Sequence, residues 1–444
     1  MEGLLSRMGS WVWGPGTLAL VLGLGGWLTV SSRFFPLRRW RTIWRETWGS
    51  LLGRGERPAG GVSPFQAMAT ALGSTVGVGS IAGVASAITL GGPGAVFWMW
   101  VSALVGMMTK YAEVVLAVRY QGRDRQGNRW GGPMAYMARG LGSRRLAGLF
   151  AAAGTAASFG IGNLNQSQEA AAALESLWGW PRPLSGCLLA LFTLLVMKGG
   201  VRWVARLAGA LVPVMALFYL GGGAVVILQD PARAAQALGA IGKGAFGWQA
   251  AAGGAAGWGI GETVRYGVAR GIFSNEAGLG SAAMAHGAAQ AQSPARQGMW
   301  GIGEVFLSTM VICTVTAVTV IASGLAGTGA EGGQLAARAF QAFLGPWGGE
   351  FVSLSILAFA LSTLLGWSYY GQRCVAWLAG EGEGAARWYR RAFVLCAGLG
   401  ALGRSQTVWA LADLLNGLMA LPNLAAVALL SPVVWREMKK EGLL

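Results

Sequence analysis

Charged residues are scarce in this sequence of 444 residues, since Asp, Glu, Lys and Arg make up only 12% of it, about half the usual share of ~25%. So few charges cannot cover a chain of this length with a water-facing surface, which excludes an ordinary soluble protein. Histidine occurs once, and the four cysteines show no C-x-x-C spacing. These shortages exclude a histidine metal centre and give no sign of a zinc site or a disulfide framework.

Apolar residues and glycine make up an unusually large share of the sequence. The hydrophobic share is 54%, and 73 glycines lie within long apolar runs without a G-x-y period. The missing period excludes collagen, and the apolar context excludes a disordered linker. Glycine in such runs is typical of closely packed membrane helices.

About eleven apolar stretches are long enough, or nearly so, for a tilted helix to cross ~30 Å of hydrocarbon. They lie at 14–32, 62–88, 93–118, 146–176, 184–200, 203–228, 253–291, 298–324, 346–372, 388–403 and 406–432. A basic segment follows the first stretch and no positive segment precedes it, so we predict a membrane helix there rather than a cleaved signal peptide. The sequence therefore predicts an all-α integral membrane protein.

The net charge of +16 follows this topology. With the N-terminus outside, 25 of the 34 Lys and Arg residues fall in inner segments and six fall in outer segments. Basic residues accumulate on the cytoplasmic side of membrane proteins. We therefore predict a multi-pass protein of the cell membrane, in contact with lipid, with a cytoplasmic C-terminus and no role in binding nucleic acid.

Two similar glycine-rich motifs indicate an internal repeat. Val76–Ser80 and Ala277–Ser281 share the pattern G-x-G-S, 201 positions apart, and each lies in the first of five stretches. Two units with an odd number of helices enter the membrane from opposite sides, which is the inverted-repeat plan of secondary transporters. The predicted parts are an N-terminal helix with a basic inner loop (1–61), a first repeat (62–228), an outer connection (229–252), a second repeat (253–432) and a tail (433–444).

Both motifs sit in the middle of a stretch beside polar residues, Ser74 and Thr75 in one, and Ser274, Asn275 and Glu276 in the other. Glycine next to such residues weakens a helix, so we expect two discontinuous helices. Free backbone groups are tolerated in hydrocarbon only where they line a cavity or meet a ligand. Their N–H groups suit a carboxylate and their carbonyl groups suit Na⁺. Glycines that merely allow close helix packing are the alternative interpretation.

Other polar positions within the stretches point to the same region. Asn163 and Gln166 share one helix face, where they can reach a substrate or simply join helices by hydrogen bonds. Phe359, Ser362 and Thr363 follow i, i+3, i+4 spacing, so two hydroxyls and a backbone carbonyl can converge on a cation that prefers oxygen. Trp367, four positions further on, can form a wall of a small pocket.

The sequence supports an expectation for four of the titratable residues inside the stretches. We expect Glu276 to cap the half-helix that follows it rather than to coordinate an ion. Lys110 and Glu113 are three positions apart and are expected to pair with each other. The single histidine, His286, is expected to be a hydrogen-bonded core imidazole with no role in function.

At these residues the chain resembles a known family, the alanine or glycine:cation symporters. The resemblance is carried by GIFSNEAGLGS at 271–281, GGPGAVFWMW at 91–100, TKYAE at 109–113, GGPM at 131–134, LGWSYYG at 365–371 and LLNGLM at 414–419. These blocks span residues 63 to 432 approximately. The resemblance implies a leucine-transporter-like fold, with five-plus-five core helices after one extra N-terminal helix, and uptake of a small neutral amino acid with Na⁺.

The resemblance also implies roles for single residues where the motifs match. It assigns Thr75, Gly77, Gln166, Asn275 and Trp367 to the substrate. It assigns the carbonyl groups of Gly73 and Val76, together with the hydroxyls of Ser362 and Thr363, to Na⁺. The family usually has Asn at the position of Ser80, so the sequence leaves a second ion contact there undecided.

The expected activity is therefore symport by alternating access, with alanine or glycine as substrate. A proton-coupled carrier of the same fold, using Glu276 or His286, is an alternative. An ion channel is disfavoured because no filter motif of charged or carbonyl rings is present in the sequence. We do not expect an enzyme, because no nucleophile, acid–base pair or metal cluster stands out. The preferred substrate and the oligomeric state are not predicted.

Overall fold

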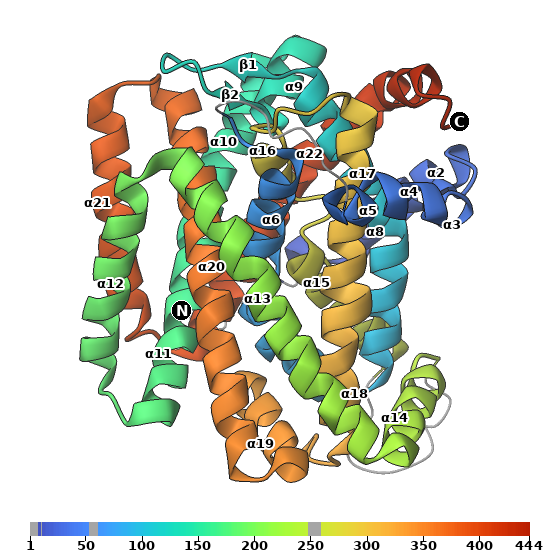
Figure 1. The fold of residues 1–444 in the computed structure, drawn as a ribbon, viewed down its shortest axis with the longest axis vertical. Helices are drawn as coiled ribbons and strands as arrows, with labels where there is room; N and C mark the ends of the chain where they lie inside the picture. The colour runs from blue at the N-terminus through green and yellow to red at the C-terminus, as the bar shows by residue number, and fades with distance from the viewer. Residues whose placement is uncertain (1–7, 10, 53–60, 247–258) are drawn as a thin grey trace.

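The computed structural model describes residues 8–9, 11–52, 61–246 and 259–444. Parts of the predicted N-terminal unit (1–61) and outer connection (229–252), and the predicted start of the second repeat at 253, lie outside these ranges. The described chain is mostly helical, and its long helices run side by side (Figure 1).

In chain order, the earlier helices are α2 (Pro15–Ser31), α3 (Phe35–Arg38), α4 (Trp40–Glu46), α5 (Trp48–Leu52), α6 (Pro64–Thr75), the 3-10 turn η1 (Val78–Ser80), α7 (Ala82–Gly91), α8 (Gly94–Arg119), α9 (Pro133–Gly140), α10 (Arg144–Phe159), the π-helical η2 (Gly160–Leu164), α11 (Asn165–Trp178), α12 (Arg182–Lys198) and α13 (Gly200–Gln229). The later helices are α14 (Pro231–Gly244), α15 (Ile260–Asn275), α16 (Ser281–His286), α17 (Pro294–Val305), the π-helical η3 (Phe306–Cys313), α18 (Thr314–Ala322), α19 (Gly332–Leu344), α20 (Pro346–Ala379), α21 (Glu383–Gly400) and α22 (Ser405–Lys440). One short antiparallel hairpin, β1 (Gly122–Arg123) with β2 (Arg129–Trp130), departs from the all-α prediction.

Within the described ranges, six helical runs are long and apolar enough to span a membrane: Gly94–Arg119, Arg144–Trp178, Gly200–Gln229, Pro294–Ala322, Pro346–Ala379 and Ser405–Lys440. The other predicted stretches fall on α2, α6 with α7, α12, α15 with α16, and α21. The helices α14 and α19 were not predicted. Both are shorter than a membrane span, so a search for long apolar runs passes over them.

The first discontinuous helix is α6 and α7. Ser63 and Gln66 form a capping box that starts α6, and the helix ends at Thr75. Gly77 then adopts an extended conformation, with φ −103° and ψ −159°, before the turn η1 and helix α7. The predicted interruption is confirmed at this motif.

The second discontinuous helix is α15 and α16. Three residues between them lie in the left-handed region, Glu276 at φ +53°, Gly278 at +94° and Gly280 at +74°. Only glycine adopts this region at low cost, which explains the two glycines of the motif. The second predicted interruption is confirmed as well.

The helices around these interruptions position the site. Helix α8 packs against α15 and α17, while α20 packs against α6, α10, α11 and α13. Helix α6 packs against both α16 and α17. These last two helices are joined by the His286 side chain, which contacts Glu304 and Gln297. The two interruptions therefore lie inside the bundle, where the residues of both motifs are buried.

Candidate functional site

The predicted ion ligands of α6 and α20 come together beside the first interruption. Ser362 Oγ lies 2.8 Å from the carbonyl oxygen of Gly73, and Thr363 Oγ1 lies 3.1 Å from the same oxygen. Ser362 Oγ is also 2.9 Å from the carbonyl oxygen of Phe359. Val76, which follows α6, is buried at the interruption. Two hydroxyls and two carbonyls are thus gathered as a cluster of oxygen donors suited to a hard cation.

Gly77 lies against two helices at once. A Cβ atom at this position would be 2.5 Å from Thr363 Oγ1 and 3.0 Å from Gln166 Oε1. The same Gln166 oxygen accepts a hydrogen bond from the backbone N–H of Val78 at 3.3 Å. Gln166 on α11 therefore faces the first interruption directly. At position 77, a side chain larger than that of glycine would collide with Thr363 and crowd Gln166.

Asn163 and Thr75 have other partners. Asn163 Nδ2 donates to the carbonyl oxygen of Phe393 at 2.7 Å, which joins η2 to α21. Thr75 Oγ1 donates to the carbonyl oxygen of Ala71 at 2.7 Å and lies 2.8 Å from Glu304 Oε1. Asn163 is thus engaged away from the interruptions, whereas Thr75 connects the first interruption to α17.

At the second interruption, Asn275 Oδ1 accepts from the backbone N–H of Ala277 at 2.9 Å, and its amide nitrogen is buried without a partner. Trp367 Nε1 donates to Glu276 Oε1 at 3.0 Å. Ser281 Oγ donates to Glu276 Oε2. The predicted capping by Glu276 is wrong, because its carboxylate binds these two side chains and α16 has no side-chain cap.

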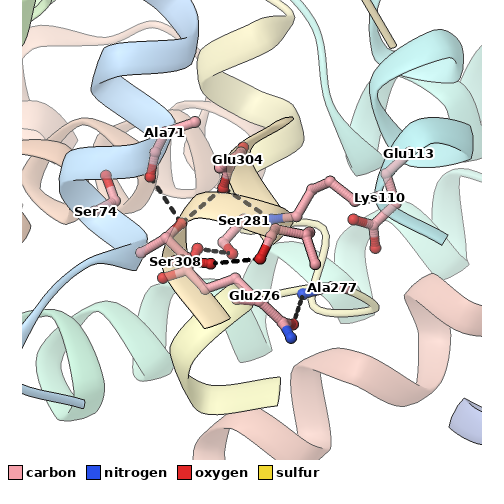
Figure 2. A network of polar contacts seen from close by, with 12 residues as sticks. Ala71, Ser74, Lys110, Glu113, Glu276, Ala277, Ser281, Glu304 and Ser308 are labelled. Atoms are coloured by element: carbon pink, nitrogen blue, oxygen red, sulfur yellow. Dashed lines mark hydrogen bonds and ion pairs between the residues drawn. The ribbon is translucent and has the colours of Figure 1, made fainter. Parts of the chain in front are cut away.

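The predicted pairing of Lys110 with Glu113 is also wrong (Figure 2). Lys110 Nζ instead lies 3.2 Å from Glu304 Oε1. Glu113 Oε1 accepts from the backbone N–H groups of Gly278 at 3.0 Å and Gly280 at 3.2 Å. Spacing along α8 places the two side chains on one face, but each finds a partner on a different neighbouring element. Glu113 thus occupies N–H groups that we expected a substrate carboxylate to use.

Glu304 is the residue that sequence reasoning missed. Its side chain is buried, and it binds Thr75, Lys110 and His286, whose Nε2 lies 3.1 Å from Oε2. His286 Nδ1 is 2.9 Å from Gln297 Nε2, so the imidazole is hydrogen-bonded in the core as predicted. A carboxylate inside the apolar stretch 298–324 was the available signal.

A cavity of about 1140 Å³ lies beyond the first interruption, lined in part by Glu169, Arg270, Trp409 and Asp413. Arg270 and Asp413 form a two-pronged ion pair with distances of 2.7 and 2.9 Å. Phe273 contacts the Arg270 guanidinium and also lies against Gly79 of the first interruption. The cavity and the interruption are therefore adjacent.

Known proteins with similar sequences are membrane transporters. The model of the sodium:alanine symporter family matches residues 1–441. The sodium/alanine symporter AgcS of Methanococcus maripaludis is 42% identical, over 98% of this chain and 96% of its own. The probable sodium/glutamine symporter GlnT of Bacillus subtilis is 36% identical, over 99% of this chain and 90% of its own.

Solved structures show the same fold at low sequence identity. A manganese transporter of Eremococcus coleocola is 16% identical with a TM-score of 0.54, over 85% of this chain and 78% of its own. MhsT in complex with L-phenylalanine is 15% identical with a TM-score of 0.50, over 87% of this chain and 100% of its own. These are leucine-transporter-like folds. As the sequence motifs indicated, the chain is a multi-pass membrane transporter rather than an enzyme and belongs to the sodium:alanine symporter family.

Proposed function

We propose that this protein imports a small neutral amino acid, alanine or glycine, together with Na⁺ by alternating access. The observation that carries the proposal is the approach of Ser362 and Thr363 to the carbonyl oxygen of Gly73. These oxygens belong to two different helices and meet next to the first interruption. A Na⁺ ion bound among them, with the carbonyl groups of Val76 and Phe359 nearby, would join α6 to α20 and order the interruption.

The proposed substrate site lies beside this ion, between the two interruptions. Gly77 and Gln166 border it at the first interruption, Thr75 lies at its edge, and Asn275 and Trp367 come from the other side. The unpartnered amide nitrogen of Asn275 is a buried donor that a carboxylate can satisfy. Asn163 would support the site through its bond to α21.

Coupling follows from this shared location. An ion that orders the first interruption raises the affinity for the amino acid, and the amino acid raises the affinity for the ion by the same factor. Inward movement of Na⁺ supplies ~2.3 kcal/mol per charge for each 100 mV of membrane potential.

The proposed architecture has about eleven spans, with inverted repeats over 62–228 and 253–432 that each contain one discontinuous helix. The N-terminus would be outside, and the tail at 433–444 would be cytoplasmic. Cysteine labelling of the two ends in intact cells tests this orientation.

Uptake into proteoliposomes tests the function. Labelled alanine should accumulate under an inward Na⁺ gradient, and accumulation should disappear when choline replaces Na⁺ at constant pH. Uptake that is unchanged in choline would reject sodium coupling. Competition by unlabelled glycine, serine, glutamine and both enantiomers of alanine then defines the substrate, because one relative is named a glutamine symporter and another an alanine symporter.

A proton-coupled carrier is the second candidate. The contact between His286 and Glu304 favours it, because it places a buried imidazole and a buried carboxylate next to Thr75 at the first interruption. Uptake of alanine driven by a pH gradient alone, without Na⁺, would support this candidate over the first.

A further inference from the structure

Lys110 is a fully buried ammonium group inside the bundle. The side chains of Lys110 and Glu304 are both 0% exposed, and their charged atoms lie 3.2 Å apart. Gly301, one turn before Glu304 on α17, makes room for the lysine stem, because a Cβ atom there would be 2.9 Å from Lys110 Cγ. Helix α17 therefore supplies both the partner of the ammonium group and the space that its side chain needs.

The pair reaches the first interruption through one more bond. Glu304 Oε1, the oxygen that faces Lys110, also lies 2.8 Å from Thr75 Oγ1. Thr75 is the last residue of α6. The Lys110 ammonium group, the Glu304 carboxylate and the Thr75 hydroxyl thus connect α8, α17 and the end of α6. Figure 2 shows the ion pair of Lys110 with Glu304 as a dashed line.

The other titratable side chains of this region have partners other than the Lys110 ammonium group. His286 binds the second oxygen of Glu304 at 3.1 Å. Glu113 is bound by backbone N–H groups and by Asn423, and Glu276 is bound by Trp367 and Ser281. Over the ranges that the structure describes, neither Glu113 nor Glu276 forms an ion pair with a basic side chain. The Lys110 charge also acts over a longer distance on Glu113 and Glu276. Of these three carboxylates, however, only Glu304 lies within ion-pair distance of Lys110.

A buried carboxylate at membrane depth is stable when a cation lies next to it. If the protein's own cation is removed, the unpaired negative charge of the carboxylate destabilises the fold. In a sodium-coupled carrier, Na⁺ from the surrounding solution can provide the missing positive charge. The Glu304 carboxylate and the Thr75 hydroxyl are oxygen ligands of the kind that Na⁺ prefers. A cation that belongs to the protein would make a bound cation at Glu304 unnecessary.

We propose that the Lys110 ammonium group is a resident cation that takes the place of a second transported cation at Glu304. This proposal rests on the function proposed above. Lys110 acts as a positioning residue through Glu304 and Thr75, and it limits the charge that enters with each amino acid. Removing its charge creates a vacancy next to Glu304 that Na⁺ or H⁺ fills and carries inward.

The test is the charge moved per labelled alanine, measured as current and uptake in the same proteoliposomes of the full chain. Lys110→Met should move about one charge more per alanine than the unchanged protein. Lys110→Arg retains the charge and should move the same charge as the unchanged protein. Lys110→Met combined with Glu304→Gln removes both charges and should restore the original ratio.

An unchanged ratio in Lys110→Met would overturn the proposal, and so would a raised ratio that persists in the double variant. If Lys110→Met does not transport, equilibrium binding of radioactive Na⁺ and of protons to the purified variant replaces the current. One additional bound cation per protein is then expected, and an unchanged number overturns the proposal. Sodium-independent uptake by the unchanged protein would contradict the proposed function separately.

Discussion

Ser362 of α20 lies 289 positions from Gly73 of α6 in the sequence, and its hydroxyl oxygen lies 2.8 Å from the carbonyl oxygen of that glycine. Thr363 Oγ1 reaches the same oxygen at 3.1 Å. Because a helical carbonyl near an interruption gains two hydroxyl neighbours from another helix, α6 and α20 are held together at the point where an ion would sit. The proposed ion site can therefore be tested by replacing the two hydroxyl groups.

Replacement of both hydroxyls, Ser362→Ala with Thr363→Ala, should raise the Na⁺ concentration for half-maximal alanine uptake by roughly tenfold or more, since each lost polar ligand is worth ~1 kcal/mol. Initial rates over a range of Na⁺ concentrations measure this. Ser355→Ala is the matched control, because the Ser355 hydroxyl donates to Phe351 within α20 itself. An equal Na⁺ requirement in the double variant and the control would place the ion elsewhere.

Gly77→Ala should reduce alanine uptake by about tenfold or more, because overpacking by one methyl group in a tight site costs ~1–3 kcal/mol. The added Cβ atom would lie 2.5 Å from Thr363 Oγ1, at the centre of the proposed site. Gly148→Ala on α10 is the control, since nothing lies within 4 Å of the Cβ position there. Full activity of Gly77→Ala would show that the first interruption does not border the substrate.

Gln166→Ala and Asn163→Ala should have different effects although the two residues share a helix face. Gln166 binds the Val78 backbone at the first interruption, so its loss should raise the KM for alanine by about fivefold or more, equivalent to ~1 kcal/mol. Asn163 binds Phe393 on α21, so its loss should lower the melting temperature with little change in KM. Uptake kinetics and thermal melting distinguish them, and a KM raised only in Asn163→Ala would reverse the two assignments.

The interruptions were predictable because glycine and polar residues weaken a helix locally, whatever lies around it. The convergence of Ser362 and Thr363 on one side of α20 was also predictable, because helical periodicity places such residues on one face. In both cases the relevant information lies within a few positions of the sequence.

The partners of Lys110 and Glu113 were not predictable from the same spacing. Residues three apart on a helix can pair, but a carboxylate 194 positions away in the sequence reaches Lys110 instead. Glu113 accepts hydrogen bonds from the backbone N–H groups of Gly278 and Gly280. These N–H groups are available because both glycines adopt left-handed conformations outside a helix. Such choices depend on how helices pack, which local patterns do not contain.

Glu113→Ala should lower the stability of the protein by ~2–4 kcal/mol and abolish most uptake, because two buried N–H groups lose their acceptor. Glu113→Gln should be milder, since an amide oxygen can still accept from Gly278 and Gly280. Added formate should partly restore uptake by Glu113→Ala if the carboxylate itself orders the second interruption. Thermal melting and uptake, each with and without formate, measure these effects.

Failure of formate to restore either property in a folded Glu113→Ala variant would show that the side chain acts mainly by filling space. Chloride at the same concentration controls for ionic strength, because it lacks the paired oxygens of a carboxylate.

Asp124 in the β1–β2 hairpin binds the end of α20, where Arg373 Nη2 donates to Asp124 Oδ2 at 2.8 Å. Partial burial opposes ionisation, but hydrogen bonds from Arg373 and from the Asn128 backbone outweigh it, so the pKa of Asp124 lies below its ordinary value of 3.8. A lowered pKa means that the ionised carboxylate stabilises the fold above this ordinary value, and that this contribution disappears as the pH falls through the lowered pKa.

Asp124→Asn should therefore lower the melting temperature of the purified protein by a constant amount from about pH 8 down to about pH 5, and the difference should shrink only below about pH 4. Glu381→Gln is the control, because its pair with Arg125 is exposed and such pairs contribute little. A difference that already shrinks between pH 8 and pH 5 would contradict a lowered pKa. The hairpin would then be held to α20 by packing of Trp130 on Trp377 rather than by the ion pair.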